Sequence, residues 1–235
     1  MANQIEKKII EACLNRCGKN LATILIFGSC NTGNFIAGKS DIDLIILLKN
    51  NNGIKLQAAE DLLKHVDFAD LKISIAHFRT LDNYKSHIYS EGTWSSWITV
   101  INGSKVIYST KEFEQFKESL KNNPIPNNIL AEYLIHKDKI ELDGYFTRSE
   151  GEDLTKAYFS HMRRKLQILN YLQNNEIEFD YTICLDNLKD LEDSTKLNQL
   201  IEFYNSRKGL NNKEAKEFYQ IAKTLTNKIT SLLNK

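Results

Sequence analysis

The feature that most constrains this chain is a pair of acids, Asp41 and Asp43, at the start of the apolar run DIDLIILL. The aliphatic and β-branched residues of this run predict a buried strand. On a strand, residues two apart point to the same face and lie roughly 7 Å apart. Two carboxylates on one face of an apolar strand are costly unless cations neutralise them. The pair therefore predicts a site for divalent metal ions.

The run before this pair, LATILIFG, predicts a second buried strand that ends at Gly28 and is followed by Ser29. Glycine permits a close approach of the backbone, and the serine hydroxyl and N–H can hold phosphate oxygens. A later run, ADLKISIAHF, alternates between apolar and polar residues, which predicts a strand that begins near Asp70. Asp70 and Lys72 lie on its polar face, so Asp70 can supply a third acid.

The segment between the two ends, Gly33 to Ser40, also fits the phosphate-loop pattern G-x-x-x-x-G-K-[ST]. That loop requires a strand directly before it and a helix that starts at its Lys-Ser pair. Here acids and β-branched residues follow Ser40, which favours a strand, and the preceding strand ends too early, at Gly28. We therefore interpret this segment as a spacer, in which Lys39 is at most an auxiliary charge.

A strand-end Gly-Ser, a spacer and an Asp-x-Asp strand together resemble the nucleotidyltransferase superfamily of DNA polymerase β. The segment FGSCNTGNFIAGKSDIDLI, residues 27–45, matches the signature of that superfamily, and the resemblance covers roughly residues 20–110. The third acid of the family opens a later strand, which corresponds to Asp70 here, with Asp67 and Glu91 as open alternatives for the third acid or base. Within the superfamily, the architecture is most similar to the aminoglycoside and lincosamide nucleotidyltransferases.

This resemblance implies metal-dependent transfer of a nucleoside monophosphate from a nucleoside triphosphate to a hydroxyl of a small molecule, such as an aminoglycoside-like antibiotic, with release of pyrophosphate. Two Mg²⁺ ions are expected. The alternatives are transfer to tRNA or protein, and a non-catalytic member of the fold in a toxin–antitoxin or regulatory pair. The implied catalytic and metal-binding residues are Asp41, Asp43 and Asp70, and the implied nucleotide-binding residues are Gly28, Ser29, Ser40 and Lys72.

The 235 residues predict an α+β nucleotidyltransferase domain, residues 1–122, followed by an all-α helical bundle, residues 123–235. The first domain is expected to hold a mixed sheet flanked by helices, and SKVIYS is expected to be an edge strand. Both prolines of the chain lie in KNNPIPNNI, which we interpret as the linker. Ser149 with Glu152, and Asn211, are predicted helix starts, and the basic run from Arg163 to Lys165 is predicted on a solvated helix face. The expected helices span residues 3–18, 54–66 and 80–98, and then 127–148, 150–175, 192–206 and 211–234.

The composition of the chain limits the classes of binding partner and the cellular location that we expect. The net charge is +1 and both signs are spread along the chain, so a long nucleic acid is not favoured. No apolar run approaches the roughly 20 residues that a membrane span needs, and the charged N-terminus does not look like a signal peptide. Four cysteines without a C-x-x-C pair favour a reduced, cytoplasmic protein. The oligomeric state stays open.

Overall fold

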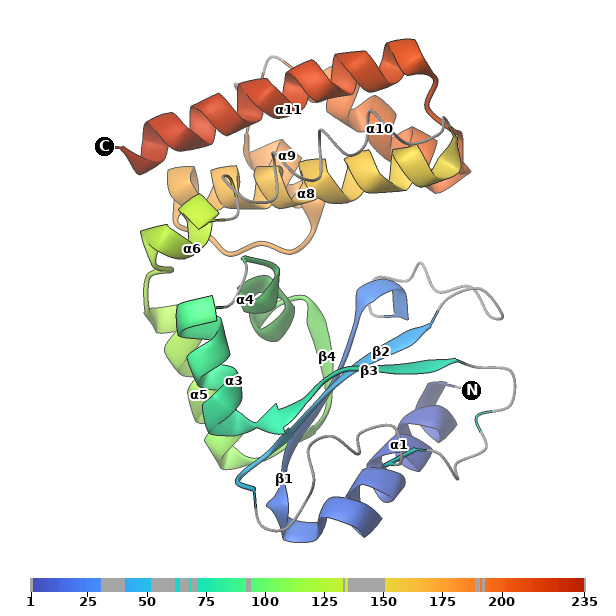
Figure 1. Cartoon of the computed structure of the whole chain (residues 1–235), viewed down its shortest axis with the longest axis vertical. Helices are drawn as coiled ribbons and strands as arrows, with labels where there is room; N and C mark the ends of the chain where they lie inside the picture. The colour runs from blue at the N-terminus through green and yellow to red at the C-terminus, as the bar shows by residue number, and fades with distance from the viewer. Residues whose placement is uncertain are drawn as a thin grey trace. The chain divides into compact units, whose positions relative to one another are not determined.

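The computed structural model describes residues 2–30, 41–51, 62–63, 68, 72–91, 94–132, 134, 151–188, 191 and 193–234. Its helices and strands are labelled in Figure 1. The chain divides into two compact units, one with Met1–Gly92 and Thr99–Pro124, the other with Thr93–Ile98 and Ile125–Lys235. The domain boundary that we expect between residues 122 and 123 stays a prediction.

A four-stranded mixed sheet lies in the first unit, with the strand order β3-β2-β1-β4 (Figure 1). Strand β1 pairs antiparallel with β2 and with β4, and β2 pairs parallel with β3. The two aliphatic runs predicted as strands are the central strands, and SKVIYS is an edge strand, as predicted. The strands span Leu21–Phe27 (β1), Ile42–Leu48 (β2), Ile73–Thr80 (β3) and Ser104–Ser109 (β4).

Both faces of the central strands are covered. Helix α1 (Ala2–Cys17) buries Ile9 and Cys13 against the side chains of one face. The alternate side chains of β1 and β2 are buried too, and α3 and α5 contact the strands in addition to α1. Strands buried on both faces read as continuous apolar runs, which is why these two were easy to predict. The α1-facing residues include Ile24, Ile26, Ile42, Leu44 and Ile46, and the alternate set includes Leu25, Ile45 and Leu47.

The segment after β3 differs from its prediction. One helix was expected over residues 80–98, but the structure has α3 (Leu81–Ser86), a π-helical turn η4 (His87–Glu91) and α4 (Trp94–Ile101). The sequence places Gly92 directly after the turn, and glycine disfavours a continuing helix. Helix α5 (Lys111–Asn122), which the sequence analysis did not predict, follows β4.

Beyond Ile125, most of the described residues of the second unit are helical, and this confirms the predicted α+β class with a helical C-terminal half. Helix α8 packs against α9, α10 and α11 (Figure 1). Helix α9 was not predicted, and of the predicted helix 127–148 only the beginning lies among the described residues. The helices are α6 (Asn127–Glu132), α8 (Glu152–Asn174), α9 (Tyr181–Asn187), α10 (Ser194–Ser206) and α11 (Asn212–Leu233).

Helix α8 corrects two further predictions. It begins at Glu152 with Gly151 as its N-cap, and the predicted start, Ser149, lies outside the described residues. Lys165, expected on a solvated face, is fully buried, and its ammonium donates a hydrogen bond to the hydroxyl of Thr226 on α11. The reason is that three helices surround α8 and leave this side of it no access to water.

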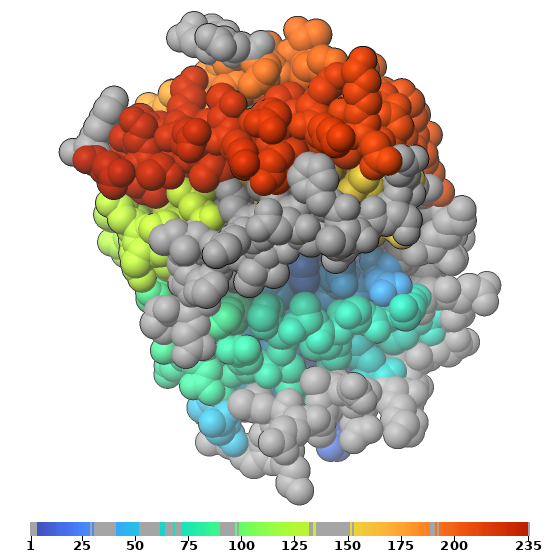
Figure 2. Space-filling model, turned by 45° about the horizontal axis from the view of Figure 1, so that its top comes forward, coloured from blue at the N-terminus to red at the C-terminus, as the bar shows by residue number. Residues whose placement is uncertain are grey.

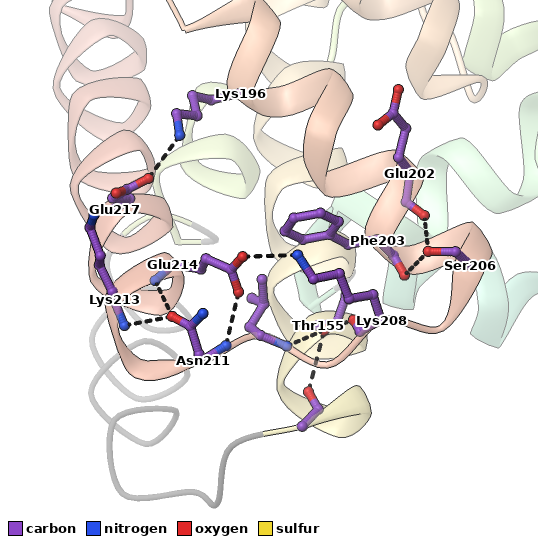
Figure 3. Close-up of polar contacts among 12 residues, drawn as sticks. Thr155, Lys196, Glu202, Phe203, Ser206, Lys208, Asn211, Lys213, Glu214 and Glu217 are labelled. Carbon is purple, nitrogen blue, oxygen red and sulfur yellow. Dashed lines mark hydrogen bonds and ion pairs between the residues drawn. The ribbon is translucent and has the colours of Figure 1, made fainter.

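The turn between α10 and α11 is held by side chains from three helices (Figure 3). The hydroxyl of Thr155 on α8 donates to the carbonyl of Lys208 at 2.7 Å and accepts from the amide of Leu210 at 3.0 Å. Asn211 then caps α11: its side chain accepts from the amides of Lys213 and Glu214, and the Glu214 carboxylate accepts from the amide of Asn211. The helix start predicted at Asn211 is therefore confirmed as a complete capping box. Figure 2 shows the helix that it starts, α11, running along the surface in red.

Replacing Asn211 by alanine is expected to lower the free energy of unfolding by about 1 kcal/mol, because two amides of the first turn of α11 lose their acceptor. Urea denaturation followed by circular dichroism measures this loss. Asn211→Asp is the matched control, since aspartate also caps helices and should retain most of the stability. Equal stability of Asn211→Ala and the wild type would show that the cap does not stabilise α11.

Among the described residues, no helix is both long enough and apolar enough to cross a lipid bilayer. All four cysteines are free thiols.

Candidate active site

Strands β1 and β2 bring the two ends of the sequence signature together. They are antiparallel neighbours, and Phe27, the last residue of β1, pairs with Asp43 near the start of β2. Gly28 begins a short 3-10 turn, η2 (Gly28–Cys30), directly after β1. The Gly-Ser end and the Asp-x-Asp end, more than ten residues apart in the sequence, therefore meet at one end of the sheet.

The two acids lie at the start of β2, where Asp43 belongs to the strand and Asp41 directly precedes it. Ile42 and Leu44 face the α1 core, so Asp43 between them points to the opposite face and is half-buried. Burial raises the pKa of the Asp43 carboxyl above its usual range, and the negative charge of Asp41 raises this pKa further. Such a pair of carboxylates attracts a cation.

Gly28 makes room for Asp43. Its φ is +72°, in the left-handed region that L side chains rarely adopt. A Cβ built on Gly28 would lie 2.9 Å from Oδ2 of Asp43, closer than Cβ atoms are found in proteins. The position thus requires glycine twice, for its backbone conformation and for the space that the carboxylate fills.

Strand β3 and the residue directly before it place Ser74 and Lys72 beside the two acids. The amide of Ile42 donates to the carbonyl of Lys72 at 2.8 Å, and Asp43 pairs with Ser74. The Nζ of Lys72 lies 3.3 Å from Oδ2 of Asp41. The strand begins at Ile73, later than the start that we expected near Asp70, so Lys72 precedes the strand and does not belong to it.

Several predicted site residues cannot be located. Asp70, Asp67, Lys39 and Ser40 lie outside the described residues. For Ser29 in η2 and Glu91 in η4, the structure gives the backbone but not the side chain. The assignment of the third acid or base therefore stays a prediction.

The structure adds neighbours that the sequence analysis missed. Strand β4 starts beside the end of β1, where Ser104 pairs with Phe27. Lys105 forms an ion pair with Glu6 of α1, with 2.8 Å between Nζ and Oε1. Burial and the charges of Glu6 and Asp43 raise the pKa of the Cys30 thiol, while Lys105 lowers it. SKVIYS was recognised as a strand, but its sequence alone does not state which end of β1 it meets.

The two acids fit a magnesium ion. Carboxylate oxygens are hard ligands, and Mg²⁺ in nucleotide-using enzymes is commonly held by one or two carboxylates together with substrate phosphates and water. The half-buried, mutually repelling charges of Asp41 and Asp43 are what a cation would neutralise. Within the part of the chain that the structure describes, no group of three or more His, Cys, Asp or Glu residues could hold a metal. Phosphates, water or residues outside that part would complete the shell.

Comparisons with known proteins agree with this geometry. Residues 7–113 match the family model described as "Polymerase beta, Nucleotidyltransferase". The crystal structure of spectinomycin adenyltransferase AAD(9) from Enterococcus faecialis, with ATP and spectinomycin, is similar to this chain with a TM-score of 0.56. The two share 15% sequence identity, and the match covers 98% of this chain and 99% of that one, so the likeness shows a common fold.

A second structure, of a toxin-antitoxin with AMP-PNP, matches at 20% identity over 60% of this chain and 98% of that chain, with a TM-score of 0.34. This similarity is too low to carry an argument. A search of curated proteins finds no match. The family match and the shared fold together show that residues 7–113 form a nucleotidyltransferase domain of the polymerase β type.

Proposed function

We propose that this chain transfers a nucleoside monophosphate from a nucleoside triphosphate to a hydroxyl group of a small molecule, in a reaction that depends on Mg²⁺. The observation that carries the proposal is the position of Asp41 and Asp43 at the end of β1, with the Asp43 carboxylate against Gly28. One or two carboxylates commonly bind Mg²⁺ together with the phosphates of a nucleotide, and the glycine turn allows the backbone to approach them closely.

In the proposed reaction, the acceptor oxygen forms a bond to the α-phosphorus, and the bond from that phosphorus to the bridging oxygen breaks. Pyrophosphate leaves with the electron pair, and the proton of the hydroxyl passes to a carboxylate, for which Asp70 is our first assignment and Asp67 and Glu91 are the alternatives. Asp41, Asp43 and Asp70 would hold two Mg²⁺ ions, which would supply charge neutralisation at the phosphates. Gly28, Ser29, Ser40 and Lys72 are the proposed nucleotide contacts.

The fold shared with AAD(9) supports a small acceptor, because the likeness extends over 98% of this chain, including its helical half. ATP and spectinomycin are bound in that structure, and they are therefore the first nucleotide and the first acceptor to test here. Other antibiotics that carry hydroxyl groups, among them aminoglycosides, complete the acceptor panel. Transfer to tRNA or protein and a non-catalytic regulatory role are the competing functions.

The proposal is tested by incubating the full chain and Mg²⁺ with each of the four labelled nucleoside triphosphates and pooled acceptors, followed by mass spectrometry. We expect a nucleotide-dependent product whose mass exceeds that of one acceptor by a nucleoside monophosphate less one water, together with pyrophosphate. Parallel pools of tRNA and cell protein test the competing acceptors. Nucleotide binding without a product in any pool would favour the regulatory role.

A further inference from the structure

Lys72 lies beside Asp41, which the proposed function assigns as a metal ligand. Its Nζ lies 3.3 Å from Oδ2 of Asp41. The backbone fixes this arrangement, because the amide of Ile42 donates to the Lys72 carbonyl at 2.8 Å and Ile42 pairs with Ile73 in the parallel ladder. Asp41 and Lys72 each precede a paired residue by one position. The register of β2 and β3 thus places Asp41 and Lys72 as neighbours, within reach of an ion pair.

The two acids of the site differ in this respect. Asp41 has a lysine as its counter-ion, whereas Asp43 has no ion-pair partner among the described residues. Lys72 is also free to leave, since its side chain is 79% exposed and that of Asp41 is 36% exposed. An exposed ion pair of this kind is weak and is readily exchanged for a stronger partner.

We propose that Lys72 is the resident counter-ion of Asp41, that a divalent metal displaces it, and that the displaced ammonium then contacts the triphosphate. This inference rests on the proposed function, because it takes Asp41 as a metal ligand. A metal ion bound to the Asp41 carboxylate repels the Lys72 ammonium and weakens its hold on that carboxylate. The flexible stem of lysine lets its ammonium move within reach of the phosphates that arrive with the metal.

The exchange predicts opposite effects on two affinities. Without nucleotide, Lys72 competes with the metal for Asp41, so its removal strengthens metal binding. With the metal bound, Lys72 attracts the triphosphate, so its removal weakens nucleotide binding. A lysine that only supported the local structure would weaken both when it is removed.

The test uses the full chain and three variants, Lys72→Met, Lys72→Arg and Asp43→Asn. Mn²⁺ is titrated without nucleotide by calorimetry, and AMP-PNP is then titrated in the presence of saturating Mg²⁺. We expect Lys72→Met to bind Mn²⁺ roughly two- to fivefold more tightly and AMP-PNP a few-fold more weakly, in keeping with the strength of an exposed ion pair. Lys72→Arg keeps the charge and should stay near the wild type in both titrations.

Unchanged or weaker Mn²⁺ binding by Lys72→Met would overturn the displacement, and unchanged AMP-PNP affinity would overturn the second contact. Asp43→Asn separates this inference from the function on which it rests. If this variant loses Mn²⁺ binding while Lys72→Met behaves as the wild type, only the role of Lys72 is wrong. If Asp43→Asn binds Mn²⁺ as tightly as the wild type, the proposed metal site itself is wrong.

Discussion

Replacing Asp43 by asparagine is expected to lower the rate of nucleotidyl transfer by at least about 100-fold, because the substitution removes a metal-binding charge while it keeps the size of the side chain. Both acids are half-buried, and the carboxylate of Asp43 fills the space left by Gly28. Steady-state kinetics with the nucleotide and acceptor found in the product screen measures the loss.

The same substitution should not destabilise the protein when no metal is present. Burial and Asp41 raise the pKa of Asp43, so its ionised form costs folding free energy at neutral pH. The folded state then binds this proton more tightly than the unfolded state, and the wild type should gain stability as the pH falls through the raised pKa. Asp43→Asn lacks this dependence, and its melting temperature at pH 7 in a metal chelator should equal or exceed that of the wild type.

Lys39→Ala is the comparison that separates the two interpretations of the spacer. A phosphate-loop lysine would be essential, whereas an auxiliary charge would cost far less than Asp43 does. The opposite result would favour the phosphate-loop interpretation. In that case Asp43→Asn would retain most of its rate and Lys39→Ala would be inactive. A lower melting temperature of Asp43→Asn would instead indicate that the carboxylate has a structural role.

The acid pair was predictable because both of its signals are local. An apolar run identifies β2, and the spacing of Asp41 and Asp43 predicts that both point to one face of a strand. In the structure Asp43 belongs to β2 and Asp41 directly precedes it. The neighbouring strand was equally visible, since Leu21–Phe27 is an almost continuous apolar run. The roles of these residues in metal and nucleotide binding remain predictions, because they concern ligands and chemistry that a fold alone does not determine.

Strand β3 shows what the sequence could not supply. Its alternation was recognised, but the register of its pairing with β2 shifts by one residue between Ile75 and His77. Ala76 therefore has no partner on β2. This bulge brings Phe78 into the same core cluster as Ile73 and Ile75, although strict alternation would put it on the opposite face. Register and bulges depend on the neighbouring strand. The ion pair of Lys72 with Asp41 could therefore not be predicted from ADLKISIAHF.

The burial of Lys165 could not be predicted either, because it also depends on contacts with other elements. Lys165 sits in a basic run that is typical of a solvent-facing helix, and only the packing of α9, α10 and α11 around α8 explains its burial. Periodicity identifies the apolar stripe of a helix, but it does not say how many neighbours the helix will have. The start of the long helix α11 was predicted well, because its cap is formed by residues that are close in the sequence, Asn211 and Glu214.

Gly28→Ala should produce the second large loss of activity, and it tests whether the shape of the glycine turn matters to the acids. The new Cβ would lie 2.9 Å from Oδ2 of Asp43, so the carboxylate or the turn must move. Displacing a metal-binding group by even a fraction of an ångström misplaces the reacting phosphate, and we expect a rate at least about tenfold lower. The left-handed φ of +72° adds a loss of folding stability of about 1–2 kcal/mol.

The chain supplies a matched control for this variant in Gly18, which follows α1. Its φ is +53°, and a Cβ added there would meet nothing within 4 Å. Gly18→Ala therefore carries a similar backbone strain without touching Asp43, so it should lose stability but keep its rate. If the two variants lose stability to a similar degree and only Gly28→Ala loses activity, the loss is due to the displaced carboxylate. If both variants keep full activity, the added Cβ at position 28 does not disturb the carboxylate of Asp43 enough to affect the transfer step. The close fit between Gly28 and Asp43 is then not needed for the reaction.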